Sequence, residues 1–168
     1  TAPNCVSPNY VSFAHNLIPP HQLLEKLVWG YTFTMVRNHI LPLVLYTAML
    51  MAALHIFAVI FSLYWLYWWI DIPLHFLGGF CVGLFSLWFF CAGKDIKPSL
   101  SSLRTLCVAL AGAFVVGLGW EIFEYYTGAV FNVLGDYTLD TLKDLTMDVT
   151  GGYVAHFYFL MVGFNKVR

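Results

Sequence analysis

Long apolar runs alternate with short polar or aromatic stretches along most of the chain. About 20 residues of helix cross the hydrocarbon layer of a membrane, and four runs have that length, at about 40–60, 72–92, 103–126 and 139–164. The last run is amphipathic and acidic in its first half and becomes apolar only from Val149. The pattern predicts an all-α, multi-pass transmembrane helix bundle with about four spans.

The N-terminal stretch differs from the rest. Residues 1–37 hold four of the seven prolines, together with Glu25 and Lys26 inside their single apolar stretch. The charged and apolar pattern of a secretory signal peptide is not found here. We expect an extramembrane segment over 1–37, a loop followed by an amphipathic interfacial helix from about Gln22 to Val36, and a transmembrane bundle over 38–168.

Composition supports a membrane location. Of the 168 residues, 60% are hydrophobic and only 10% are charged, whereas an ordinary soluble domain carries about 25% charged residues. A water-soluble globule is therefore excluded, and the lipid bilayer is the expected partner. The net charge of −1 argues against a nucleic-acid binder of the usual basic kind.

The charges separate between the two ends of the predicted bundle. With four spans, seven of the eight bases fall at one end and only Lys143 at the other; the seven are Lys26, Arg37, Lys94, Lys97, Arg104, Lys166 and Arg168. Basic residues collect on the cytoplasmic side, so both termini should be cytoplasmic. Seven acids gather at the opposite, external end: Asp71, Glu121, Glu124, Asp136, Asp140, Asp144 and Asp148.

The spacing of these acids indicates which of them share a helix face. Asp140, Asp144 and Asp148 are four residues apart, Glu121 and Glu124 are three apart, and Asp71 and His75 are four apart, so the members of each set lie on one side of a helix. A rise of 1.5 Å per residue places Asp140 and Asp148 roughly 12 Å apart. No single ion can therefore bind the whole aspartate ridge.

Buried acids need a positive partner. A charged residue at the bilayer centre costs about 2.5–3.5 kcal/mol even on the most favourable insertion scale, and like charges also repel each other. Oxygen donors favour Mg, Ca or Mn, and imidazole admits Zn or Fe. The sequence therefore predicts a divalent metal site of unspecified identity near the external face, with these candidate ligands: Asp71, His75, Glu121, Glu124, Asp144 and Asp148.

The same positions carry a family resemblance. Asp71-x3-His75 with Gly78-Gly79, Trp120-Glu121-x2-Glu124, and Asp140-Thr141-x2-Asp144-x3-Asp148-x2-Gly151 together span roughly 60–163. This three-part pattern resembles the YjdF-like family of uncharacterised bacterial inner-membrane proteins, and more loosely VanZ-like proteins. The resemblance implies a multi-helix membrane fold and a shared set of polar positions, and it implies no particular reaction.

Several of these residues also have plain structural interpretations. Asp71 can cap its helix, and Asp136 and Asp140 fit a turn and a helix start. His55 and His156 fit histidines that hydrogen-bond a neighbouring backbone, although His156 could also relay protons or bind a haem or pigment. Trp120 fits either an interfacial anchor or a wall of the site. The small-x3-small faces Gly79-x3-Gly83, Ala113-x3-Gly117 and Gly151-x3-Ala155 predict close helix packing.

Three functions remain open at this point. The first is a cation-binding membrane protein whose site has a structural, transport or hydrolytic role, with Glu124 able to take a proton from a bound water in a hydrolase. The second is an accessory subunit of a larger membrane complex that carries pigment or haem. The expected protein partners are accordingly a second copy of the chain, in a homo-oligomer, or such a larger complex. The third is a proton-coupled transporter without metal. The motifs of nucleophilic hydrolases and phosphate loops are not found, so whether the chain is an enzyme stays undecided.

Overall fold

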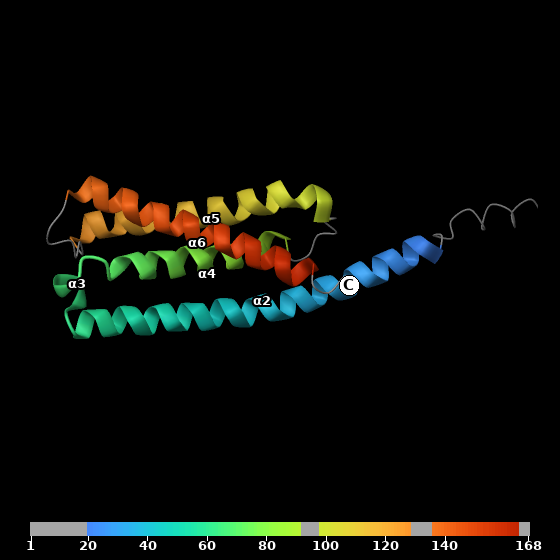
Figure 1. Ribbon diagram of the computed structural model, residues 1–168, viewed down its shortest axis with the longest axis horizontal. Coiled ribbons are helices and arrows are strands. Elements are labelled where there is room, and N and C mark those ends of the chain that lie inside the picture. Colours follow the sequence, from blue (N-terminus) through green and yellow to red (C-terminus); the bar gives the residue numbers. More distant parts are fainter. Residues whose placement is uncertain (1–19, 92–97, 129–135, 165–168) are drawn as a thin grey trace, which may run out of the picture.

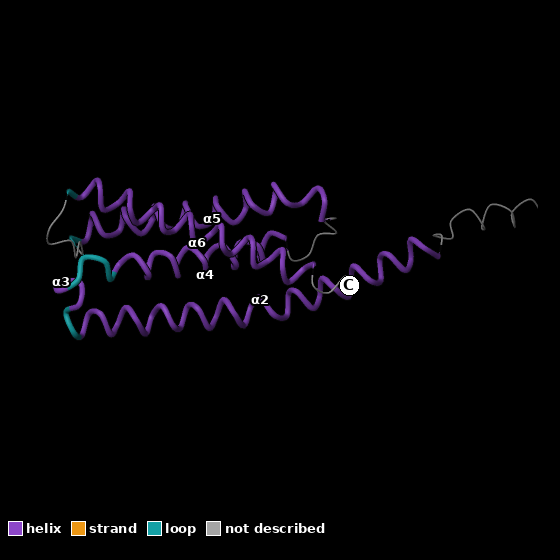
Figure 2. The backbone as a smooth tube through the Cα atoms, viewed as in Figure 1, coloured by secondary structure: helices purple, strands orange, loops and turns teal. Residues whose placement is uncertain are grey.

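The computed structural model describes residues 20–91, 98–128 and 136–164, and almost all of them are helical (Figures 1 and 2). No strand occurs among these residues, which confirms the all-α class. The helices are α2 (Pro20–Ile60), α3 (Leu63–Leu66), α4 (Asp71–Cys91), α5 (Pro98–Thr127) and α6 (Tyr137–Phe164).

Three of the described helices are long and apolar enough to cross a membrane. The segments that qualify are His39–Ile60 of α2, Asp71–Cys91 of α4 and Leu103–Thr127 of α5, and they coincide with the first three spans expected from the sequence. α6 has 28 residues, which at 1.5 Å each makes it roughly 42 Å long. It is not among the three helices that qualify. The multi-pass helical fold is thus confirmed, and a fourth crossing by α6 stays a prediction.

α2 is a single helix of 41 residues that contains Pro42. At 1.5 Å per residue it is roughly 62 Å long, about twice the thickness of a hydrocarbon layer. The amphipathic helix expected over 22–36 is therefore continuous with the first span rather than separate from it (Figure 1). Its location at a membrane surface remains a prediction, and residues 1–19 of the expected N-terminal loop lie outside the described part of the chain.

α4 is the central helix of the bundle and packs against α6, α5 and α2. A Cβ added to Gly79 would collide with the backbone of Asp148 on α6, and one added to Gly83 would lie 2.9 Å from the Cα of Gly152. Because these glycines have no side chain, the backbones of α4 and α6 approach each other closely. The close packing predicted from the small residues is confirmed.

One end of the bundle gathers the end of α2, α3, the start of α4, the end of α5 and the start of α6 (Figure 1). Ser62 adopts a left-handed conformation with φ 54° and turns the chain from α2 into α3. Gly128, with φ +66°, follows the last residue of α5, as is common at helix C-termini. Asp136 precedes α6 and accepts a 2.9 Å hydrogen bond from the backbone N–H of Thr138. The capping role expected for Asp136 is confirmed.

Candidate metal centre

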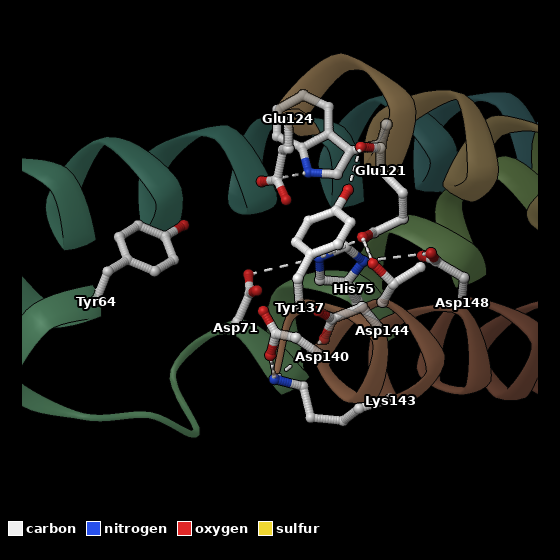
Figure 3. Close-up of polar contacts among 12 residues, drawn as sticks. Tyr64, Asp71, His75, Glu121, Glu124, Tyr137, Asp140, Lys143, Asp144 and Asp148 are labelled. Atoms are coloured by element: carbon white, nitrogen blue, oxygen red, sulfur yellow. Dashed lines mark hydrogen bonds and ion pairs between the residues drawn. The ribbon is translucent and has the colours of Figure 1, made fainter. Parts of the chain in front are cut away.

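The predicted ligands converge at this end of the bundle. α4 contributes Asp71 and His75, α5 contributes Glu121 and Glu124, and α6 contributes Asp144 and Asp148 (Figure 3). All are buried except Asp71, with Asp144 only 1% exposed and Glu121 3% exposed. Asp71 retains 24% of its side-chain exposure. Each of the three helices thus contributes two ionisable residues that are three or four positions apart in the sequence. The fold brings these pairs into one interior cluster, as the spacing predicted.

His75 lies in the middle of the cluster. Its Nδ1 is 3.2 Å from Oδ2 of Asp148 on α6. Its Nε2 is 3.5 Å from Oδ1 of Asp71 and 4.0 Å from Oε1 of Glu121 on α5. One imidazole thus faces carboxylates from three helices.

Three of these groups are close enough to share an ion. Asp71, His75 and Asp144 each offer one ligand atom, and these atoms lie within 4.8 Å of one another. Two atoms bound to one ion by bonds of about 2.1 Å lie up to about 4.2 Å apart, and bonds of about 2.5 Å allow about 5 Å. The three atoms would have to move closer together to bind one ion.

The cluster holds more negative than positive groups. Its six carboxylates, counting Asp140, face at most two cations, His75 and Lys143 (Figure 3). Lys143 Nζ is 2.6 Å from Oδ1 of Asp140 and 3.4 Å from Oδ1 of Asp144. Oδ1 of Asp144 and Oε1 of Glu121 are buried and accept no hydrogen bond. Buried carboxylate oxygens of this kind are costly unless a proton or a cation compensates them.

Glu121 is held by residues of α6. Thr141 donates a 2.8 Å hydrogen bond to its Oε2, and the hydroxyl of Tyr137 donates a 3.0 Å bond to its backbone oxygen (Figure 3). The carboxylate is fixed through one oxygen, which leaves the other, Oε1, on the side of His75. A fixed carboxylate with one free oxygen is suited to bind a cation.

Glu124 occupies a different side of the cluster. Its Oε1 accepts a 2.9 Å hydrogen bond from Nε1 of Trp120, and both residues line a cavity of about 340 Å³. Asp71, His75 and Asp148 border the same cavity. Of the two interpretations of Trp120, the structure supports the one in which its side chain forms a wall of the site.

A model of the family described as "Predicted membrane protein (DUF2238)" matches residues 22–164. The chain belongs to this family. No curated protein and no solved structure matches it. Membership in DUF2238 agrees with the expected uncharacterised membrane family, and the narrower resemblance to YjdF-like proteins stays a prediction.

Tyr64 is a residue of this DUF2238 chain that the sequence pattern did not assign to the site. It stands in an aromatic stretch typical of a membrane interface, yet it is only 7% exposed. Its hydroxyl lies 2.7 Å from Nδ1 of His55 on α2. Burial raises the pKa of the Tyr64 phenol above its ordinary value of 10.0, and the carboxylates of Asp71 and Glu124 raise it further. Tyr137 was missed as well, and Thr141 was named only as part of the family pattern, since nothing in their spacing points to α5.

The two histidines given structural interpretations differ from expectation. His55 bonds the Tyr64 hydroxyl and lines the cavity, whereas we expected a backbone partner. His156 is 3% exposed, and its Nδ1 has no hydrogen-bond partner. His156 is not part of the group of side chains that could share an ion.

Proposed function

We propose that this membrane protein binds a divalent cation between α4, α5 and α6, with Asp71, His75 and Asp144 as ligands. The observation that carries the proposal is the position of His75, whose ring nitrogens lie 3.2–4.0 Å from carboxylates of three helices. Oε1 of Glu121 is buried without a hydrogen-bond partner, and Oδ1 of Asp144 has only the ammonium of Lys143, 3.4 Å away. Both oxygens support a positive guest at this point.

The two nitrogens of His75 suggest separate roles. A metal-bound histidine usually donates its other ring N–H to a carboxylate, which fixes the tautomer and the ring orientation. Asp148 is placed for that role at Nδ1, which leaves Nε2 for the ion beside Asp71. Glu121, 4.0 Å from Nε2, is a further ligand within reach, and Glu124 faces the cavity instead.

The donor set favours some ions over others. One imidazole with several carboxylates suits Zn, Mn or Fe better than Mg or Ca, which prefer oxygen ligands alone. Because His75, Asp71 and Asp148 border the cavity, a bound cation would have a side open to a second ligand. This access favours a transport or hydrolytic centre over a purely structural one.

We also propose the orientation given by the charges, in the inner membrane of a bacterial cell with both termini in the cytoplasm. Arg104 belongs to the first part of α5, whereas the acids belong to the opposite end of the bundle. Basic residues favour the cytoplasmic side, so the cluster would lie near the external face.

Elemental analysis of protein purified in mild detergent without chelators tests the metal site. We expect about one Zn, Mn or Fe ion per chain in the wild type, and its loss in His75→Asn and Asp144→Asn. His39→Asn is the matched control, because His39 is exposed on α2 and should leave the metal content unchanged.

Two outcomes would contradict the proposal. Wild-type protein that is folded but free of metal, including after incubation with each ion, would indicate that protons neutralise the cluster, as a proton-coupled transporter requires. Metal retained in full by both substituted proteins would place the ion elsewhere.

A further inference from the structure

The cavity beside the cluster lies among α2, α4 and α5. These helices supply most of its lining residues, and α2 and α5 make few or no contacts with each other over the part of the chain described here. Val116 and Trp120 of α5 line the cavity while being 53% and 42% exposed. A ligand could therefore enter from the hydrocarbon layer rather than from water.

The lining combines an apolar surface with carboxylates. Met51, Leu74 and Val82 are among its apolar members. Its carboxylates are Asp71, Glu124 and Asp148, and no lysine or arginine is among the lining residues. These carboxylates would repel an anionic ligand. A neutral ligand would leave their negative charge uncompensated.

Glu124 is the carboxylate of the cavity that has no positive partner of its own. Asp148 contacts His75, and Asp71 contacts the same ring, whereas the contact found for Glu124 is the indole N–H of Trp120. Trp120 and Tyr64 also bring aromatic rings to the wall. Aromatic faces attract organic cations at sites shielded from water.

We propose that this cavity binds an organic cation with an apolar body, such as an alkylammonium amphiphile, with Glu124 as the counter-charge. The proposal goes beyond the metal centre and does not depend on it, because Glu124 is not among the ligands proposed for the divalent ion, although Asp71 and His75 border the same cavity. An apolar cavity of about 150 Å³ holds one benzene molecule. By this measure the volume of about 340 Å³ would accept an apolar body on the order of a dozen carbon atoms.

Calorimetric titration of the protein in lipid nanodiscs, corrected with empty nanodiscs, tests the proposal. The probes are alkyltrimethylammonium ions from butyl to octyl, with alkyl sulfonates and alcohols of the same chain lengths for comparison. We expect saturable binding of one ammonium ion per chain, tightening about fourfold per methylene until the cavity is filled. The sulfonates should not bind saturably, and the alcohols should bind at least tenfold more weakly than the ammonium ions.

Adjacent residues of α2 provide a matched pair of variants. Ala52 lines the cavity and Ala53 does not, although both are exposed. Ala52→Phe should abolish binding and Ala53→Phe should preserve it, while Glu124→Gln should weaken ammonium binding at least tenfold.

Metal content measured on the same samples separates this proposal from the preceding one. Ammonium binding by metal-free protein would support the cavity site and contradict the metal site. Two results with metal-loaded protein would overturn the proposal for the cavity and leave the metal site intact. One is equal affinity for the ammonium ions and the alcohols. The other is an equal effect of Ala52→Phe and Ala53→Phe on ammonium binding.

Discussion

Two adjacent glycines of α4 provide a test of the close contact between α4 and α6. A Cβ at Gly79 would lie 2.6 Å from the Cα of Asp148, whereas one at Gly78 would lie 3.5 Å from Sδ of Met51, an ordinary contact. Carbon atoms in contact prefer about 3.5–4.0 Å, so Gly79→Ala should force the two helices apart by about 1 Å. Gly78→Ala should leave them in place.

The expected energies follow from two opposing effects. Replacing glycine by alanine inside a helix gains about 1 kcal/mol, whereas overpacking costs about 1–3 kcal/mol. Gly78→Ala should therefore be neutral or slightly stabilising. Gly79→Ala should be neutral to about 2 kcal/mol destabilising. The two variants should differ by about 1–3 kcal/mol.

The same displacement should affect the proposed metal centre. The His75 to Asp148 contact of 3.2 Å would lengthen to about 4 Å, beyond hydrogen-bond distance. Losing such a support for a metal-bound histidine typically lowers metal affinity 10–100-fold. Thermal unfolding in one fixed detergent, with metal affinity measured by chelator competition, would compare the two variants. Equal stability and equal metal affinity would refute the close approach of α4 and α6 at Gly79.

Two further predictions concern tyrosines at the same end. Because folding raises the pKa of Tyr64, its contribution to stability is complete below about pH 10 and is lost as the pH rises further. Denaturation measured from pH 8 to 11 should therefore show a steeper alkaline loss of stability in the wild type than in Tyr64→Phe, and parallel curves would contradict this. Tyr137→Phe removes the hydrogen bond to the backbone of Glu121 and should cost about 1 kcal/mol of unfolding free energy. Tyr126 is 80% exposed, so Tyr126→Phe should leave the free energy of unfolding unchanged. Equal effects of the two substitutions would be evidence against the hydrogen bond of Tyr137.

The helices could be predicted from the sequence because span length and charge depend on local residues. The positions of α4 and α5 agree with the expected runs to within a few residues at the membrane-facing segments. The continuity of α2 from the expected interfacial helix over 22–36 into the first span could not be predicted in this way. The polar residues Arg37, Asn38 and His39 between the two resemble a helix boundary, yet α2 continues through them.

In the candidate site, too, some features could be predicted from local spacing and others depend on how the helices pack. Residues three or four apart on one helix share a face by geometry alone, so the grouping of Asp140 with Asp144 and of Glu121 with Glu124 was accessible from spacing. Which nitrogen of His75 faces which helix depends on the rotation of α4 against α6, and that rotation is set by Gly79 and Gly83. The recruitment of Tyr64 depends on the left-handed turn at Ser62, a conformation that the sequence does not reveal.

Synthesis from the N-terminus delivers α6 after α4 and α5, so the predicted fourth crossing would be made against helices that are already in place. An aspartate costs up to about 2.5–3.5 kcal/mol in a membrane, and α6 is not among the helices that are apolar enough to cross by themselves. Insertion of α6 would therefore depend on the surface that α4 offers, above all on the imidazole that contacts Asp148. A chain without His75 would then leave α6 exposed to proteolytic quality control.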